Sequence, residues 1–142
     1  MRVVLDTSII IAAIRSSAGA AAEIVRLVFL RRMILLMDYK LACEYREVAV
    51  RSEHLRASEK TQREIGLVLD ALEALAEPVL VCAKIRPLSE DPGDDMVLDI
   101  AINGLADAIV THNVRHFRAA ASRFRIPVLR PVELLGLIQE ER

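Results

Sequence analysis

The sequence is poor in aromatic residues and cysteines, and these shortages limit how the protein is held together. Aromatic side chains make up 4% of the 142 residues, whereas hydrophobic residues make up 54%. The core must therefore be built mainly from Val, Ile, Leu and Ala. The two cysteines, Cys43 and Cys82, lack CxxC spacing and have apolar neighbours, which favours small buried hydrophobes over a disulfide or a zinc site. A reducing compartment suits such cysteines best.

The sequence also lacks an apolar run long enough to span a membrane. Arg26, Arg31 and Arg32 interrupt its most hydrophobic predicted helix. A signal peptide is not predicted either, because Asp6 interrupts the short apolar stretch at the N-terminus. We therefore expect a soluble, cytoplasmic protein without a membrane partner.

No repeat, low-complexity segment or long linker divides the chain, so residues 1–142 are predicted to form a single domain. The net charge of -1 neither favours nor excludes nucleic acid, because local patches matter more than the total. One short stretch is rich in arginine: it contains Arg115, Arg118, Arg123, Arg125 and Arg130. Guanidinium groups suit phosphate contacts, although a solvated helix face explains any single one of them equally well.

Short apolar runs alternate with amphipathic segments along the chain. Strands are predicted at 3–5, 33–37, 79–81, 108–110 and 126–129, and helices at 7–14, 20–30, 41–51, 58–76, 95–104 and 131–139. Thr7 and Ser8 are expected to cap the first helix, and residues 87–94 to form a loop. Unbroken apolar strands alternating with helices indicate βαβ units. The predicted fold is a three-layer α/β/α domain with a mainly parallel central sheet of about five strands.

Polar residues follow two of the predicted strands. Asp6 comes directly after the first strand, and Asn113 lies shortly after the fourth. Because ligands bind at the carboxyl ends of parallel strands, both are expected to face one crevice. Asp95 begins a predicted helix, whose dipole favours an anion there, and Asp99 lies four residues later on the same face. Asp99 is the candidate auxiliary metal ligand.

Carboxylates that face one another repel and require a cation, for which Mg²⁺ or Mn²⁺ is the natural choice. Such an ion activates water and stabilises charge on a phosphate, so phosphodiester hydrolysis is the expected reaction. Each acid also has a plainer explanation: Asp6 as a helix cap, Glu44 as a solvated helix residue, and Asp95 as part of an acidic turn. Asp94 is expected to have a loop or capping role, and Asp107 to be a turn or hydrogen-bonding residue. His112 and His116 are expected to be solvated.

Three segments together resemble the PIN-domain family. They are VVLDTSIIIAA, EYREVAVR and DPGDDMVLDIAINGLADAIVTHNVRHF, and the resemblance covers nearly the whole chain. More narrowly, the sequence resembles the PIN-family toxins of prokaryotic toxin-antitoxin systems. This resemblance implies metal-dependent cleavage of RNA and a small antitoxin as partner.

Carried over from the family's motifs, the acidic positions fall on Asp6, Glu44 and Asp95, with Asn113 at the fourth polar position. Many family members have Asp at that position, so the resemblance implies a site with one charge fewer and a single resting metal. The family's hydroxyl positions fall on Thr7, Ser8 and Thr111, which are expected to orient an acid or water, or to cap a helix.

Two other functions compete with the ribonuclease hypothesis. The first is a noncatalytic module that binds RNA or an antitoxin, in which Asn113 in place of an acid has abolished catalysis. A phosphate-accepting receiver domain is disfavoured, because the third predicted strand ends in Val81-Cys82-Ala83 without an Asp. The apolar residues Ile24, Leu27, Val28 and Phe29 are expected to pack mainly in the core, with a partner groove or homodimer face as the alternative use.

Overall fold

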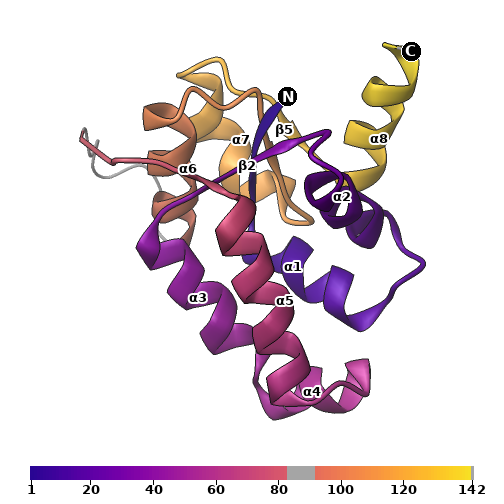
Figure 1. The fold of residues 1–142 in the computed structure, drawn as a ribbon. Helices are drawn as coiled ribbons and strands as arrows, with labels where there is room; N and C mark the ends of the chain where they lie inside the picture. The colour runs from indigo at the N-terminus through magenta and orange to yellow at the C-terminus, as the bar shows by residue number, and fades with distance from the viewer. Residues whose placement is uncertain (83–91, 142) are drawn as a thin grey trace.

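The computed structural model describes residues 1–82 and 92–141, and its centre is a five-stranded parallel sheet (Figure 1). The strands are β1 (Arg2–Leu5), β2 (Ile34–Met37), β3 (Glu77–Pro78), β4 (Ala108–Val110) and β5 (Val128–Leu129). Their order is β3-β2-β1-β4-β5, and every neighbouring pair is parallel. Successive strands are added to one side of β1 and then to the other, so strand order reverses between β1 and β4.

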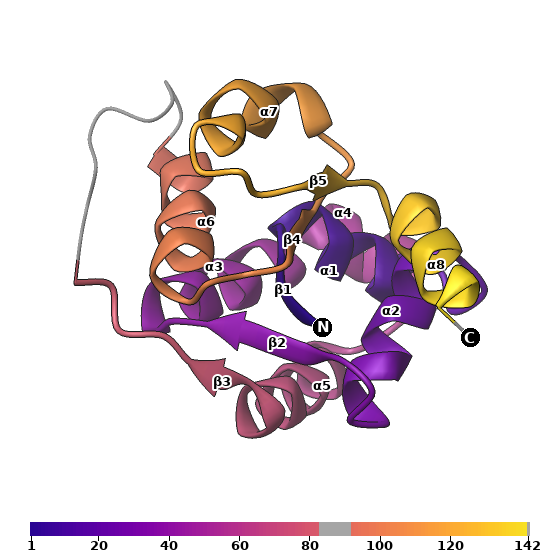
Figure 2. The same cartoon turned by 90° about the horizontal axis from the view of Figure 1, so that it is seen from above.

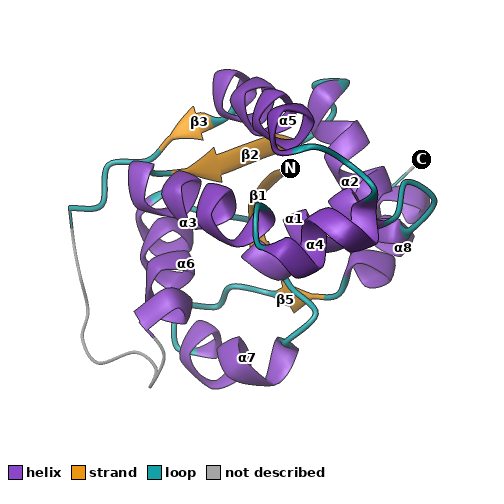
Figure 3. Ribbon diagram, turned by 90° about the horizontal axis from the view of Figure 1, so that it is seen from below, coloured by secondary structure: helices purple, strands orange, loops and turns teal. Residues whose placement is uncertain are grey.

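Eight helices accompany the strands in the described part of the chain. They are α1 (Thr7–Arg15), α2 (Ala20–Phe29), α3 (Tyr39–Ala49), α4 (Ser52–Ser58), α5 (Gln62–Leu75), α6 (Pro92–Asn103), α7 (Val114–Ser122) and α8 (Pro131–Glu140). Helices α6 and α7 lie on one side of the sheet, and α1, α2 and α8 lie on the other (Figure 2). Figure 3 shows the strands enclosed by helices, which confirms the predicted three-layer α/β/α fold.

The central strands are buried because both of their faces meet helices. Val3, Val4 and Leu5 of β1 are fully inaccessible to solvent, as are Leu35 of β2 and Ile109 of β4. This explains why the sequence shows unbroken apolar runs rather than an alternating pattern at these strands.

Most predicted elements are present, but the region between 52 and 76 differs from the prediction. The helix predicted at 58–76 begins only at Gln62, where Thr61 and Glu64 form a capping box. The preceding α4 was not predicted, and it ends where Glu59 adopts a left-handed backbone with φ of 59°. This left-handed residue separates α4 from α5.

The second half of the chain also departs from the prediction. The strand predicted at 79–81 is wrong: β3 is Glu77–Pro78, because its partner β2 ends at Met37 and offers only one further acceptor, to the Val79 N–H at 2.9 Å. Helix α7 was not predicted at all. Of the loop predicted at 87–94, residues 87–91 lie outside the described residues, and 92–94 belong to α6.

Both cysteines are exposed and free, so the prediction that they are buried is wrong. Cys43 lies on α3 between the buried Ala42 and the buried Tyr45, and the helical turn directs it to the opposite side. In the described ranges no single helix is long and apolar enough to cross a membrane, although the bent pair α1–α2 passes by length and composition alone.

Candidate functional site

Asp6 lies where strand order reverses, at the carboxyl end of β1. Its backbone N–H donates to the Val110 carbonyl of β4 at 3.0 Å, which fixes it beside the end of that strand. The Ser8 hydroxyl donates to Asp6 Oδ2 at 2.9 Å, and the Thr111 hydroxyl donates to the same oxygen at 2.8 Å. Among the described residues Oδ1 receives no hydrogen bond, so two hydroxyl groups orient the carboxylate through one oxygen and leave the other for a ligand.

Glu44 is tied to the same place from α3. The Thr7 hydroxyl, next to Asp6 in the chain, donates to Glu44 Oε2. Thr7 and Ser8 thus hold the two acids and do not cap α1 as expected; the N-cap residue is Asp6, which makes no side-chain capping bond. The Asp6 side chain is therefore not a helix cap. The geometry agrees instead with the role that the resemblance implies for Thr7 and Ser8, whose hydroxyl groups orient the acids.

Tyr45 was not identified from the sequence, although it anchors the site. It is buried, and its phenol donates to the Leu5 carbonyl at the end of β1. Burial, aided by the negative charges of Asp6 and Glu44, raises the pKa of Tyr45 well above its ordinary value. Tyr45 therefore stays neutral and fixes α3 against β1. The sequence signal that could have identified Tyr45 is a large side chain next to Glu44 on the apolar face of the predicted helix.

Asp95 and Asp99 lie on α6 and are 6% and 3% exposed, so this helix directs both acids inward. Asp94 lies in the first turn of α6 rather than in a loop, and its Oδ2 is 3.5 Å from His116 Nδ1. Because His116 is in the first turn of α7, this contact brings the beginnings of α6 and α7 together.

Asn113 occupies the N-cap position of α7. Its backbone N–H donates to the Thr111 hydroxyl at 2.9 Å, so Thr111 joins Asn113 to Asp6. The Asn113 side chain is exposed and makes no capping bond. Hydrogen bonds thus connect the backbone of Asn113 to the Asp6 carboxylate, while Asn113 itself adds no negative charge.

The donor set fits a hard divalent ion, although no preformed cage is present. Within residues 1–82 and 92–141 no group of three or more His, Cys, Asp or Glu side chains is gathered closely enough to hold a metal. Mg²⁺ commonly uses one or two carboxylates and completes its shell with water and phosphate oxygens. An oriented Asp6 carboxylate near Glu44 meets that requirement in chemistry, and Asp95 would be an additional carboxylate.

Several plainer expectations are confirmed. Asp107 is a hydrogen-bonding turn residue, whose Oδ2 accepts from the Arg2 N–H at 2.7 Å. His112 and His116 are exposed. Ile24, Leu27 and Val28 are buried in the core, whereas Phe29 is 38% exposed.

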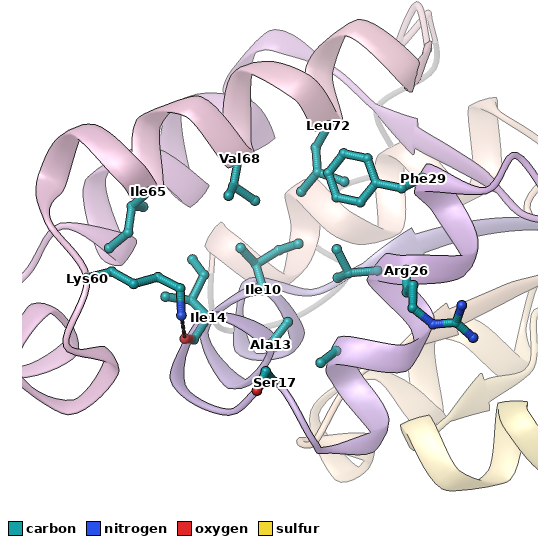
Figure 4. A pocket seen from close by; sticks show the side chains of 12 residues that line it. Ile10, Ala13, Ile14, Ser17, Arg26, Phe29, Lys60, Ile65, Val68 and Leu72 are labelled. Atoms are coloured by element: carbon teal, nitrogen blue, oxygen red, sulfur yellow. Dashed lines mark hydrogen bonds between the residues drawn. The ribbon is translucent and has the colours of Figure 1, made fainter.

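Phe29 borders an apolar pocket of about 300 Å³ between α1, α2 and α5 (Figure 4). Ile10, Val25 and Val68 contribute to its lining, and Arg26 and Lys60 are its charged members. None of the candidate site acids lines this pocket, so it lies apart from the acidic site at the carboxyl end of β1.

Comparisons with known proteins agree with this fold. In fold the chain is similar to the crystal structure of VapBC2 from Rickettsia felis bound to a DNA fragment from their promoter, with a TM-score of 0.61 and 16% identity. The match covers 92% of this chain and 98% of that chain, and at this identity it shows the fold alone. No curated protein matches the chain. The family model of the PIN domain matches residues 2–115, and the chain therefore belongs to the PIN-domain family.

Proposed function

We propose that this PIN-domain protein is a metal-dependent ribonuclease that hydrolyses RNA phosphodiester bonds, and that it is the toxin of a toxin-antitoxin pair. The observation that carries the proposal is the Asp6 carboxylate, oriented by Ser8 and Thr111 at the point where strand order reverses. Asp6, Glu44 and Asp95 would hold Mg²⁺ or Mn²⁺, with Asp99 as an auxiliary ligand. When bound, such an ion lowers the pKa of water and offsets charge on the phosphate.

The residues of the chain divide the remaining work. Two hydroxyl donors on Oδ2 of Asp6 fix its plane, and the donor from Thr7 fixes Glu44, so both acids are oriented before substrate arrives. Asn113 lies beside them without a charge of its own. The lower negative charge supports a single resting metal, and the Asn113 amide would be a hydrogen-bond donor for a phosphate oxygen.

Cleavage assays with matched acid variants test the proposal. Wild type, Asp6→Asn and Asp95→Asn are incubated with mixed structured and single-stranded RNAs in Mn²⁺, Mg²⁺ or EDTA. Wild type is expected to cleave only with metal, and both variants are expected to lose cleavage while keeping the wild-type circular dichroism spectrum. Glu140→Gln, a change at an exposed residue at the end of α8, is the control for charge loss outside the site.

Unchanged cleavage by Asp95→Asn would remove Asp95 from the site. Absence of cleavage by every protein, despite a folded spectrum, would favour the noncatalytic module that binds RNA or an antitoxin. Weak or absent Mn²⁺ binding in calorimetry would support that second function, for which the uncharged Asn113 is the specific observation.

An antitoxin is the partner that this proposal requires. Similarity in fold to VapBC2 supports it, and the apolar pocket offers a surface for an apolar segment of such a partner. Co-expression with the product of the neighbouring gene should give a stable complex that suppresses cleavage. A soluble, nontoxic chain that copurifies with no neighbour would contradict the toxin assignment.

A further inference from the structure

The charge of the chain is divided unevenly along the sequence. Residues 108–132 contain five arginines, two histidines and no acidic residue. The rest of the chain has 14 basic and 20 acidic residues, so a segment of charge +5 is joined to a remainder of charge −6. A net charge close to zero therefore conceals a strongly basic segment, and that segment contains β4, α7 and β5.

Helix α7 presents its basic residues to solvent. Val114, Phe117, Ala120 and Ala121 are buried against the rest of the protein. Arg115 and Arg118, three residues apart, are exposed and share the outer face of the helix. Arg123 follows at the C-cap, and Arg125 has a left-handed backbone with φ of 57° immediately beyond it.

These four arginines are not neutralised by acids in the part of the chain that the structure describes. Arg2, Arg26, Arg46 and Arg51 each pair with a carboxylate, and Arg130 pairs with Glu133 at 3.6 Å. Arg115, Arg118, Arg123 and Arg125 form no ion pair with a described residue. An array of unpaired guanidinium groups is suited to phosphates, which each can bind through two hydrogen bonds.

The basic face begins at the candidate site and leads away from it. Asn113 directly precedes α7, and the contact between His116 and Asp94 joins the first turn of α7 to that of α6. Arg115 and Arg123 are eight residues apart, or roughly 12 Å along a helix axis. This span exceeds one phosphate group, so a strand held by both ends of α7 would be contacted at more than one phosphate.

We propose that Arg115, Arg118, Arg123 and Arg125 form a phosphate track for single-stranded RNA on one side of the acidic site. This inference rests on the proposed ribonuclease function, from which it takes RNA as the occupant. The track attracts the phosphates of RNA, which the acidic remainder of the molecule does not. It also determines on which side of the scissile bond the rest of the bound strand lies.

The test separates binding from cleavage. Binding of a fluorescein-labelled single-stranded RNA to the Asp95→Asn protein is measured at several KCl concentrations with constant Mg²⁺. Arg115→Gln/Arg118→Gln is compared with Arg56→Gln/Arg63→Gln, which removes the same charge from exposed positions on α4 and α5. The first pair is expected to weaken binding and to reduce the slope of log K against log salt by about 1.4, or about 0.7 for each lost phosphate contact. The second pair should leave the slope unchanged.

Restoration of the slope by Arg115→Lys/Arg118→Lys would support phosphate contacts, because charge is kept. Equal slopes in both glutamine pairs would overturn the track, since binding would then depend on net charge alone. The outcome is independent of catalysis. If the wild type cleaves no RNA, and the salt slope falls only when Arg115 and Arg118 are replaced, the nuclease function is refuted and the phosphate track is retained.

Discussion

Hydroxyl groups orient the Asp6 carboxylate, and the contribution of Thr111 is the easiest to isolate by substitution. It is fully buried, donates to Asp6 Oδ2 and accepts from the Asn113 N–H. Thr111→Val keeps the shape and removes both bonds. We expect cleavage and Mn²⁺ affinity to fall roughly 10- to 100-fold, as for other groups that orient a metal ligand.

Thr111→Ser restores the hydroxyl and should recover most of both quantities, as measured by cleavage rate and calorimetric Mn²⁺ titration. A defect in the Ser variant alone, with Thr111→Val close to wild type, would mean that Thr111 acts through packing of its methyl group rather than by orienting Asp6.

Because of Tyr45, the stability of the folded protein is expected to depend on pH in the alkaline range. Its pKa is raised in the folded protein, so the native state holds the phenol proton more tightly than the unfolded chain does. This contribution to stability is complete below the ordinary tyrosine pKa of about 10 and is lost as the pH rises above it. Urea denaturation of wild type should therefore show the free energy of unfolding falling above about pH 10.

Tyr45→Phe removes the titrating group and leaves the Leu5 carbonyl without its donor. At neutral pH we expect it to be less stable by about 1 kcal/mol. Above pH 10 its stability should fall less steeply than that of wild type, and Tyr39, present in both proteins, cancels in the comparison. Parallel profiles for the two proteins would show that the Tyr45 proton is not linked to folding.

At this scale the sequence indicates which residue types do the chemistry but not their hydrogen bonds. Asp6 and Thr111 are recognisable because each follows a buried strand. That both Ser8 and Thr111 donate to one oxygen of Asp6 depends on β1 lying beside β4, which no local pattern contains. Tyr45 escaped prediction for the same reason, since its partner is a backbone carbonyl 40 residues away.

Among the elements, the turn from α6 into β4 depends on the absence of a side chain at Gly104. A Cβ there would lie 2.8 Å from the Ile100 carbonyl oxygen and 2.9 Å from Val79 Cγ2. Gly104→Ala is expected to destabilise the protein by about 1–3 kcal/mol, because the backbone contact cannot yield easily. Thermal melting followed by circular dichroism measures the loss.

Gly66→Ala is the matched control. Gly66 lies within α5 with nothing within 4 Å of its added Cβ, so the exchange should stabilise by about 0.5–1 kcal/mol through helix propensity. We therefore predict changes in stability of opposite sign for Gly104→Ala and Gly66→Ala. A neutral Gly104→Ala would mean that the end of α6 shifts without cost.

Elements with strong local signals were predictable, and those set by tertiary partners were not. β1 and α1 follow from an apolar run and the helical spacing after it. The strand predicted at 79–81 fails because β2 ends at Met37, and pairing is a property of two strands. Helix α7 does carry a helical apolar pattern, at Val114, Phe117 and Ala121, but it is short and surrounded by arginines.

For the whole molecule, the parallel sheet could be predicted from its buried runs, whereas its order could not. The order β3-β2-β1-β4-β5 places the ends of β1 and β4 together, and so brings Asp6 beside Thr111 across more than 100 residues of chain. The site is therefore a consequence of the complete fold. Asp6, Glu44 and Asp95 belong to three different elements, and an unfolded chain does not keep them near one another.

A metal that binds these acids must for that reason stabilise the folded state alone. Mn²⁺ at about 100 times its Kd should add about 2.7 kcal/mol and raise Tm by roughly 5–10 °C for a chain of this size. EDTA should return Tm to its starting value. Asp95→Asn is expected to lose most of the shift, whereas the exposed change Glu140→Gln on α8 should keep it. If Asp95→Asn kept the full shift, the ion would bind elsewhere. If wild type showed none at any Mn²⁺ concentration that supports cleavage, the acids would not be its ligands in the absence of RNA, and the substrate phosphate would have to complete the metal site.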